Sequence, residues 1–124
     1  METKTETGYL NVTVSGAFAR NSLLCVNTST GKYDLAQEAT AAALIVGHLT
    51  QESFADGDKR VVKMLNAPGT HTGYSSEALA LTDTLKADDG GKIGTASGSG
   101  AAVGVPLEAV GADEFFEYRP IVAG

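Results

Sequence analysis

The sequence contains no tryptophan and only one cysteine, Cys25, among its 124 residues. One cysteine cannot form an intramolecular disulfide or supply a multi-cysteine zinc site, so a single chain has neither a disulfide framework nor such a zinc site. A chain of this length can instead fold as one domain that buries about two-thirds of the surface of its unfolded form. Cys25 stands between Leu24 and Val26, and we expect it to be a small buried apolar residue.

Basic residues are also scarce. The chain has nine lysines and arginines and fifteen acidic residues, which gives a net charge of −6. This charge repels phosphate groups, so we expect no nucleic acid and no anionic membrane among the partners, and we favour a protein partner. Residues 1–6 lack the apolar segment of a signal peptide, and no apolar run approaches the length of a membrane span. We therefore expect the protein to act where it is made.

Groups of residues with catalytic or metal-binding spacing are missing as well. His48 and His71 have no cysteine or histidine companions at ligand spacing, which favours surface or satisfied core histidines. Residues 98–104 miss the dinucleotide fingerprint, because Val103 stands where its third glycine is required. The acidic turns at 56–58 and 88–90 do not complete a calcium-binding loop. We expect no catalytic residue, no cofactor-binding residue and no metal ligand, and hence no enzyme.

The residues that are abundant favour β-structure. Fifteen glycines, together with much alanine, threonine and valine, are typical of short strands joined by tight turns. We predict an all-β fold, a small compact antiparallel β-barrel or β-tulip-like domain with at most one or two short helices. The expected strands are residues 23–27, 44–46, 60–65, 78–82, 102–107 and 114–121. Residues 66–76 are expected to form an irregular loop, and residues 33–43 fit a short helix and an extended segment equally well.

The first residues alternate in polarity. Leu10, Val12 and Val14 form an apolar row opposite polar or amphipathic odd-numbered residues, which predicts a strand with one buried face. Residues 1–6 have no apolar face and are expected to be a mobile arm in the free protein. We therefore divide the chain into an N-terminal arm and edge strand, residues 1–16, and a β-barrel body, residues 17–124.

Features recur in the same order in the two halves of the chain. A strand, a polar turn ending in Gly31-Lys32, a small-residue segment, Val46-Gly47, an acidic turn and a strand follow one another in the first half. The second half repeats this order around Gly91-Lys92 and Val103-Gly104. The order indicates a shared strand-turn-strand plan, and a two-unit pseudo-repeat of residues 21–65 and 77–122.

Three segments of the second half carry a resemblance to a known family. Gly91-Lys92-Ile93, residues 102–109 and residues 114–119 resemble the C-terminal end of tailed-phage capsid decoration proteins, also called cement or head-stabilising proteins. The match is weaker over residues 21–65. Pro106 and Pro120 depart from the pattern and imply edge positions or a bulge.

The resemblance implies a function as well as a fold. Proteins of this kind are small β-barrel or β-tulip virion proteins that stabilise an assembled phage capsid from its outer surface. A member of the family is made in the host cytoplasm, binds the major capsid protein and self-associates, usually as a homotrimer. It needs no cofactor.

The N-terminal arm and strand are the expected capsid-binding segment. An extended, threonine-rich arm that leads into an edge strand suits strand addition to the sheet of another chain. The expected contact residues are Thr5, Thr7, Tyr9, Leu10, Val12 and Val14. The alternatives are a frayed terminus, or a strand whose apolar row belongs to the core of the protein itself. In the latter case the capsid contacts should lie on residues 66–76 and 95–101.

Two other classes of function stay open at this stage. A receptor- or carbohydrate-binding head domain would need exposed aromatic side chains on one face, and Tyr74 is the best candidate for such a position. An enzyme would need carboxylates such as Glu108 and Glu117 in acid and base roles, but no histidine, lysine or metal set accompanies them.

Overall fold

In a computed structural model of the chain, the structure describes residues 8–95 and 101–120. These residues form ten short β-strands and two single-turn 3-10 helices, so the prediction of an all-β fold is confirmed. The elements are β1 Tyr9–Thr13, β2 Leu23–Val26, β3 Tyr33–Leu35, η1 Ala42–Leu44, β4 Ile45–Leu49, β5 Lys59–Met64, β6 His71–Tyr74, β7 Leu85–Ala87, η2 Asp89–Gly91, β8 Ile93–Gly94, β9 Ala102–Pro106 and β10 Phe115–Pro120. Neither helix in the described part of the chain is long and apolar enough to cross a membrane.

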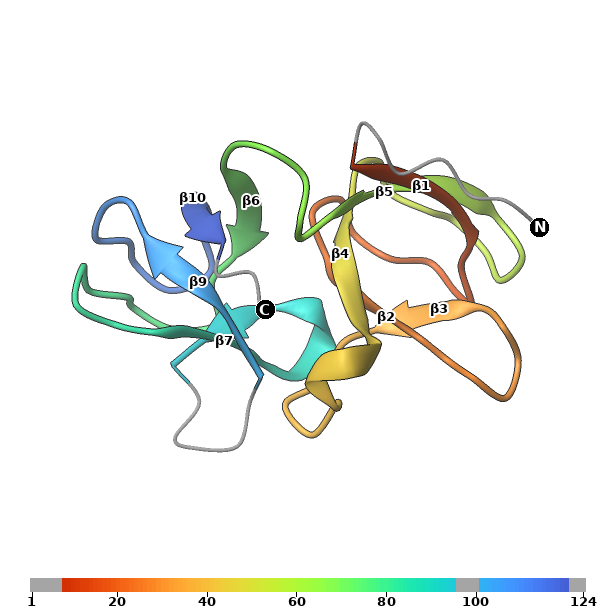
Figure 1. The fold of residues 1–124 in the computed structure, drawn as a ribbon, viewed down its shortest axis with the longest axis horizontal. Helices are drawn as coiled ribbons and strands as arrows, with labels where there is room; N and C mark the ends of the chain where they lie inside the picture. The colour runs from red at the N-terminus through yellow and green to blue at the C-terminus, as the bar shows by residue number, and fades with distance from the viewer. Residues whose placement is uncertain (1–7, 96–100, 121–124) are drawn as a thin grey trace.

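The strands form two five-stranded sheets that lie side by side (Figure 1). The first sheet has the order β1-β5-β4-β2-β3, and the second has the order β6-β10-β9-β7-β8. All neighbours within each sheet are antiparallel. We call the first five strands unit A, residues 9–64, and the last five unit B, residues 71–120. Strand for strand, the two units have the same topology.

Equivalent residues in the two units follow from the pairing registers. Gly47 of β4 pairs with Leu24 of β2, and Gly104 of β9 pairs with Leu85 of β7. In both units the register shifts immediately after that leucine, so the units share an irregularity as well as a strand order. The pairing gives these equivalent positions: Leu10 and His71, Thr13 and Tyr74, Val14 and Ser75, Lys59 and Phe115, and Val62 and Tyr118.

Each sheet curls because the strands at its two ends meet at one point. A single parallel bridge joins Val14 to Tyr33 in unit A, and the equivalent bridge joins Ser75 to Ile93 in unit B. The backbone N–H of Ser15 donates to the carbonyl of Tyr33 at 3.0 Å, next to the first bridge. Each unit is therefore a half-closed barrel.

One glycine in each unit permits the closest approach of the backbone. A Cβ atom on Gly47 would lie 2.0 Å from the carbonyl oxygen of Lys63, and one on Gly104 would lie 2.3 Å from that of Arg119. Real Cβ atoms do not come this near to a backbone atom, so only glycine fits at either position. The repeated Val-Gly pairs of the sequence mark these two sites.

Two groups of buried side chains form the core. The first fills unit A and consists of Val12, Val14, Leu24, Leu49 and Val62. The second joins the units, because side chains of unit A such as Leu23, Cys25 and Ala36 pack with the interior of unit B around Leu85, Ile93, Phe116 and Tyr118. Unit B therefore completes its core with the outer surface of unit A. Cys25 is buried as expected, and burial raises the pKa of its thiol.

Several expected elements are corrected by the structure. Residues 78–82 are not a strand: Leu79 makes one isolated bridge with Val110, and the side chain of Asp83 caps the following turn by accepting from the N–H of Ala80. The strand of this region is β7, a few residues later. Residues 66–76 contain β6, whose sequence His-Thr-Gly-Tyr has little strand character. For residues 33–43, where a short helix and an extended segment were both left open, the structure has the extended β3 at the start and the 3-10 turn η1 from Ala42.

The pairing of β1 shows how the expected edge strand is placed. β1 pairs with β5 along its whole length and is the terminal strand of the first sheet. Pro106 and Pro120 were expected at edges or bulges, but they are the last residues of β9 and β10, which are interior strands of their sheet. A proline at the end of a strand removes an N–H only where the ladder finishes.

Candidate functional sites

The residues expected to bind a capsid do not share one environment. Tyr9 is 40% exposed, whereas Val12 and Val14 are buried in the core of unit A and Leu10 packs against that core. The side chains of this apolar row therefore pack within the chain, which is the alternative of an apolar row in the protein's own core. Thr5 and Thr7 lie outside the described residues.

The backbone of β1 has one edge without a paired strand in the described part of the chain, because β1 is the terminal strand of its sheet. The N–H of Val14 donates toward β5, to Asp58, while the next N–H donates in the opposite direction, to Tyr33. Alternate residues of an antiparallel strand bond to the same neighbour. The N–H groups of Tyr9, Asn11 and Thr13 therefore point away from β5. This edge can add a strand even though the apolar side chains cannot take part.

A polar cluster lies buried between the two units. The phenol of Tyr118 is 2.6 Å from Nε2 of His48, and Nδ1 of His48 is 2.9 Å from the carbonyl oxygen of Asn21. A carbonyl only accepts, so Nδ1 carries the proton and Nε2 accepts from Tyr118. The ring of His71 lies 6.1 Å from that of His48, and its Nε2 donates to the carbonyl of Leu65 at 3.0 Å. Nδ1 of His71 is buried and has no partner within the described residues.

These hydrogen bonds suit neutral rings. Burial lowers the pKa of His48 to about 4, and the nearby charges of His71 and Lys63 act in the same direction. Burial likewise lowers the pKa of His71 and raises that of Tyr118. The three rings are almost wholly enclosed, with His48 3% and His71 1% exposed. The cluster therefore links the two units by hydrogen bonds between neutral groups.

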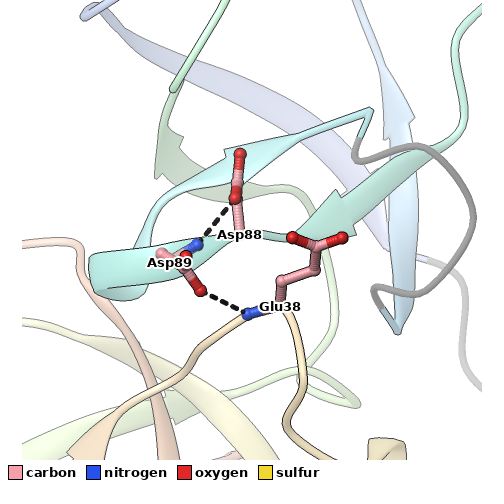
Figure 2. Close-up of side chains that lie close together, drawn as sticks. All are labelled: Glu38, Asp88 and Asp89. Atoms are coloured by element: carbon pink, nitrogen blue, oxygen red, sulfur yellow. Dashed lines mark hydrogen bonds between the residues drawn. The ribbon is translucent and has the colours of Figure 1, made fainter.

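Three carboxylates meet where the two units touch (Figure 2). Oxygens of Glu38, Asp88 and Asp89 lie within 4.8 Å of one another, close enough to surround a cation. Two of the side chains also accept hydrogen bonds: Oδ1 of Asp89 from the backbone N–H of Glu38, and Oδ2 of Asp88 from the hydroxyl of Ser76. The bond between Glu38 and Asp89 holds the loop after β3 against η2, which explains why the carboxylates lie close together. Residues 88–90 form a turn, as expected.

A pocket of about 460 Å³ opens along the junction of the units, and we call it the seam pocket. Its lining includes Arg20 from unit A and Tyr74, Lys92 and Phe115 from unit B. The Tyr74 and Phe115 rings meet edge to face, 5.0 Å between centroids, and Nζ of Lys92 lies 5.6 Å from the centre of the Tyr74 ring. Phe115 is 57% exposed. Aromatic and cationic groups therefore face the same hollow.

Sequence reasoning identified one member of this pocket, Tyr74, and missed the others. The alternation of β10 could have identified Phe115, because Phe116 and Tyr118 are buried while Phe115 lies on the other face with Glu117. No local pattern connects Arg20 to these residues, since it lies more than fifty positions from Tyr74. Two loops, residues 66–76 and 95–101, were also expected as alternative capsid contacts. The first loop includes the pocket residue Tyr74. In the second loop, residues 96–100 lie outside the described residues.

Comparisons with known proteins bear on the fold. No family model and no curated protein matches the sequence. Among solved structures, the N base of the head fiber protein gp8.5 of bacteriophage phi29 has a similar fold, with a TM-score of 0.68. The match covers 94% of this chain and 98% of that chain, at 12% sequence identity. The two chains therefore share an architecture over nearly their whole lengths.

Proposed function

We propose that this protein is a structural component of a phage head. The observation that carries the proposal is the fold match to the phi29 head fiber base, which spans almost all of both chains. The resemblance of residues 91–119 to capsid decoration proteins points to the same part of the virion. The enclosed histidine cluster supports a structural role, because its rings are engaged in joining the two units.

In the finer form of the proposal, the protein binds the major capsid protein on the outer surface of the assembled capsid and stabilises the capsid as a homotrimer. The free edge of β1 is the surface that we assign to the contact. Strand addition there would use main-chain hydrogen bonds, with specificity from exposed neighbours such as Tyr9 and Val61.

The test uses capsids from particles that lack the protein. Added protein should sediment with them, saturate at a fixed number of copies per capsid and raise the temperature at which the capsids break. Failure of the protein to bind these capsids would contradict the proposal.

A matched pair of variants tests the edge itself. Asn11 is exposed, and its N–H points away from β5, so Asn11→Pro removes one outward donor while sparing the β1–β5 pairing. Asn11→Ala keeps the donor. We expect the proline variant to remain folded but to lose capsid binding, and the alanine variant to bind like the parent. Equal binding by both variants would exclude the β1 edge as the contact.

The homotrimer is tested separately, by light scattering of the purified protein on a sizing column. A mass of three chains is expected. A mass of one chain at all concentrations would leave the head association intact and remove the trimer from the proposal.

The seam pocket favours a second candidate function, a recognition module. The sequence alone left this class open and named Tyr74 for it. Tyr74 lies beside an exposed phenylalanine and a lysine in a concave site, and this combination supports the candidate.

A further inference from the structure

The aromatic pair of the seam pocket is not required by the fold. Tyr74 and Phe115 are cross-strand partners, and their equivalents in unit A are Thr13 and Lys59. In unit A this pair makes a hydrogen bond, from Nζ of Lys59 to the hydroxyl of Thr13 at 3.2 Å. The same strand pairing thus accommodates a polar pair. The aromatic rings in unit B therefore need an explanation other than strand pairing.

Charge gives the pocket a second distinctive property. The chain has fifteen acidic and nine basic residues, yet the two charged side chains that line the pocket, Arg20 and Lys92, are both basic. Arg20 is exposed. Lys92 makes an ion pair of 3.7 Å with Asp113, in which both side chains are largely exposed, so this pairing is weak. The pocket therefore presents positive charge on a protein that is acidic as a whole.

The wall of the pocket is fixed in position before any ligand arrives. Gly91 donates from its N–H to the carbonyl of Ala36, and Gly90 donates to the side-chain oxygen of Gln37. A Cβ on Gly91 would lie 2.9 Å from the side chain of Leu35, and its φ of +75° is one that favours glycine. The η2 turn is thus held tightly against unit A. A preformed wall reduces the entropy that is lost on binding.

We propose that the seam pocket binds a carboxylated saccharide. A sugar ring can lie against the exposed face of Phe115, and its carboxylate can pair with the guanidinium of Arg20 and the ammonium of Lys92. The volume falls within the usual range for small-ligand sites, about 300–1,000 Å³. An acidic peptide strand fits less well, because the bridge from Ser75 to Ile93 closes the edge of β6 next to Tyr74. The proposal does not depend on attachment to a phage head.

The experiment is an NMR titration of the isotopically labelled full chain with trigalacturonic acid, with neutral galactotriose as the matched ligand. We expect the acidic trisaccharide to shift the amide signals of Gly90, Gly91 and Lys92 and the ring signals of Tyr74 and Phe115. Galactotriose should bind at least tenfold more weakly, because it lacks the carboxylates.

Three variants locate the site. Replacing Tyr74→Thr and Phe115→Lys together gives unit B the pair that unit A already carries, so the fold should persist and binding should weaken at least tenfold. Arg20→Gln should weaken binding of the acidic ligand and leave that of the neutral ligand unchanged. The control is Phe54→Lys: Phe54 is 68% exposed, with the guanidinium of Arg60 5.7 Å from its ring centre, but it does not line the seam pocket. This control should bind like the parent.

Four outcomes would overturn the proposal. One is the absence of shifts at millimolar trigalacturonic acid. The second is equal affinity for both trisaccharides, because the cations would then contribute nothing. The third is a set of shifts that the double variant leaves unchanged. The fourth is binding of a triglutamate peptide at these residues without binding of the acidic sugar, which would assign the pocket to peptides.

Discussion

The interiors of units A and B differ in polarity although their strands pair in the same order. The positions Leu10, Val14 and Val62 of unit A are occupied by His71, Ser75 and Tyr118 in unit B. Unit A buries its aliphatic set within its own sheet, whereas unit B completes its core with side chains from unit A. Polar groups are tolerated in unit B because each has a hydrogen-bond partner. Tyr118 bonds to His48 of unit A, His71 bonds to the carbonyl of Leu65, and Ser75 donates to the carbonyl of Gly111 within unit B.

Features that units A and B share are those that the fold requires, and residues that differ between the units are ones that the fold allows to change. Both units keep the glycine that faces a neighbouring carbonyl, the register shift after a leucine, and a turn closed by a glycine with positive φ, Gly31 or Gly91. Side chains at other equivalent cross-strand positions differ between the units, as at Thr13 and Lys59 against Tyr74 and Phe115. Function is therefore expected at positions where the units differ, and the seam pocket lies at one of them.

The largest expected effect comes from removing the first strand. Deletion of residues 1–15 takes away Val12 and Val14, which are buried in the core of unit A, and unit B then loses the surface that completes its own core. We expect loss of the cooperative unfolding transition in circular dichroism. A truncated chain that still unfolds cooperatively would show that β1 is an accessory arm after all.

The paired glycines should respond alike. Gly47→Ala and Gly104→Ala each place a Cβ against a backbone carbonyl, and each is expected to cost about 3 kcal/mol of stability in denaturant titrations, the upper end for overpacking. Gly111→Ala is the control, because its Cβ would meet only the side chain of Glu114, at 3.4 Å or more. Very different costs at Gly47 and Gly104 would contradict the equivalence of the two units.

Acid should weaken the junction between the units. The pKa of His48 is lowered from 6.5 to about 4, so the unfolded chain takes up the proton first. The associated stability, about 3 kcal/mol, is fully present above pH 6.5 and is lost as the pH falls through 4. Denaturant titrations between pH 7 and pH 4 measure it. His48→Gln should flatten this part of the pH profile, and an unchanged profile would remove His48 as its cause.

The smallest effect is expected at the exposed aromatic ring. Phe115→Lys copies the residue found at the equivalent position of unit A, and Phe115 is largely exposed, so stability should change by no more than about 0.5 kcal/mol. Thermal unfolding measures this change. A loss of several kcal/mol would mean that the ring supports the fold, and would weaken the argument that it is present for a ligand.

Local patterns in the sequence account for the features that were predicted correctly. Alternation located the strand at residues 9–13, and the repeated Gly-Lys and Val-Gly pairs fall at equivalent positions of the two units. The suggested repeat boundaries, 21–65 and 77–122, omit β1 and β6, the first strand of each unit. β6 was missed because its four residues include a histidine and a glycine and show no apolar alternation.

Contacts between distant residues could not be predicted in this way. His48 and Tyr118 are 70 positions apart and meet only because the two units pack together. Each histidine looked isolated in the sequence for the same reason. The sequence did show that β1 has an apolar face. Whether this face packs on the core of the protein itself or on a partner depends on the pairing of β1 with β5. No local sequence pattern predicts that pairing.

Association with a phage head is the central claim, and electron cryomicroscopy of capsids carrying the protein tests it most directly. The account predicts two-lobed density, one lobe for each unit, at fixed symmetry positions on the outer surface, with the free edge of β1 against the major capsid protein. Capsids that lack the protein should show no such density. Absence of this density from capsids saturated with the protein, or density on the inner surface, would contradict the account.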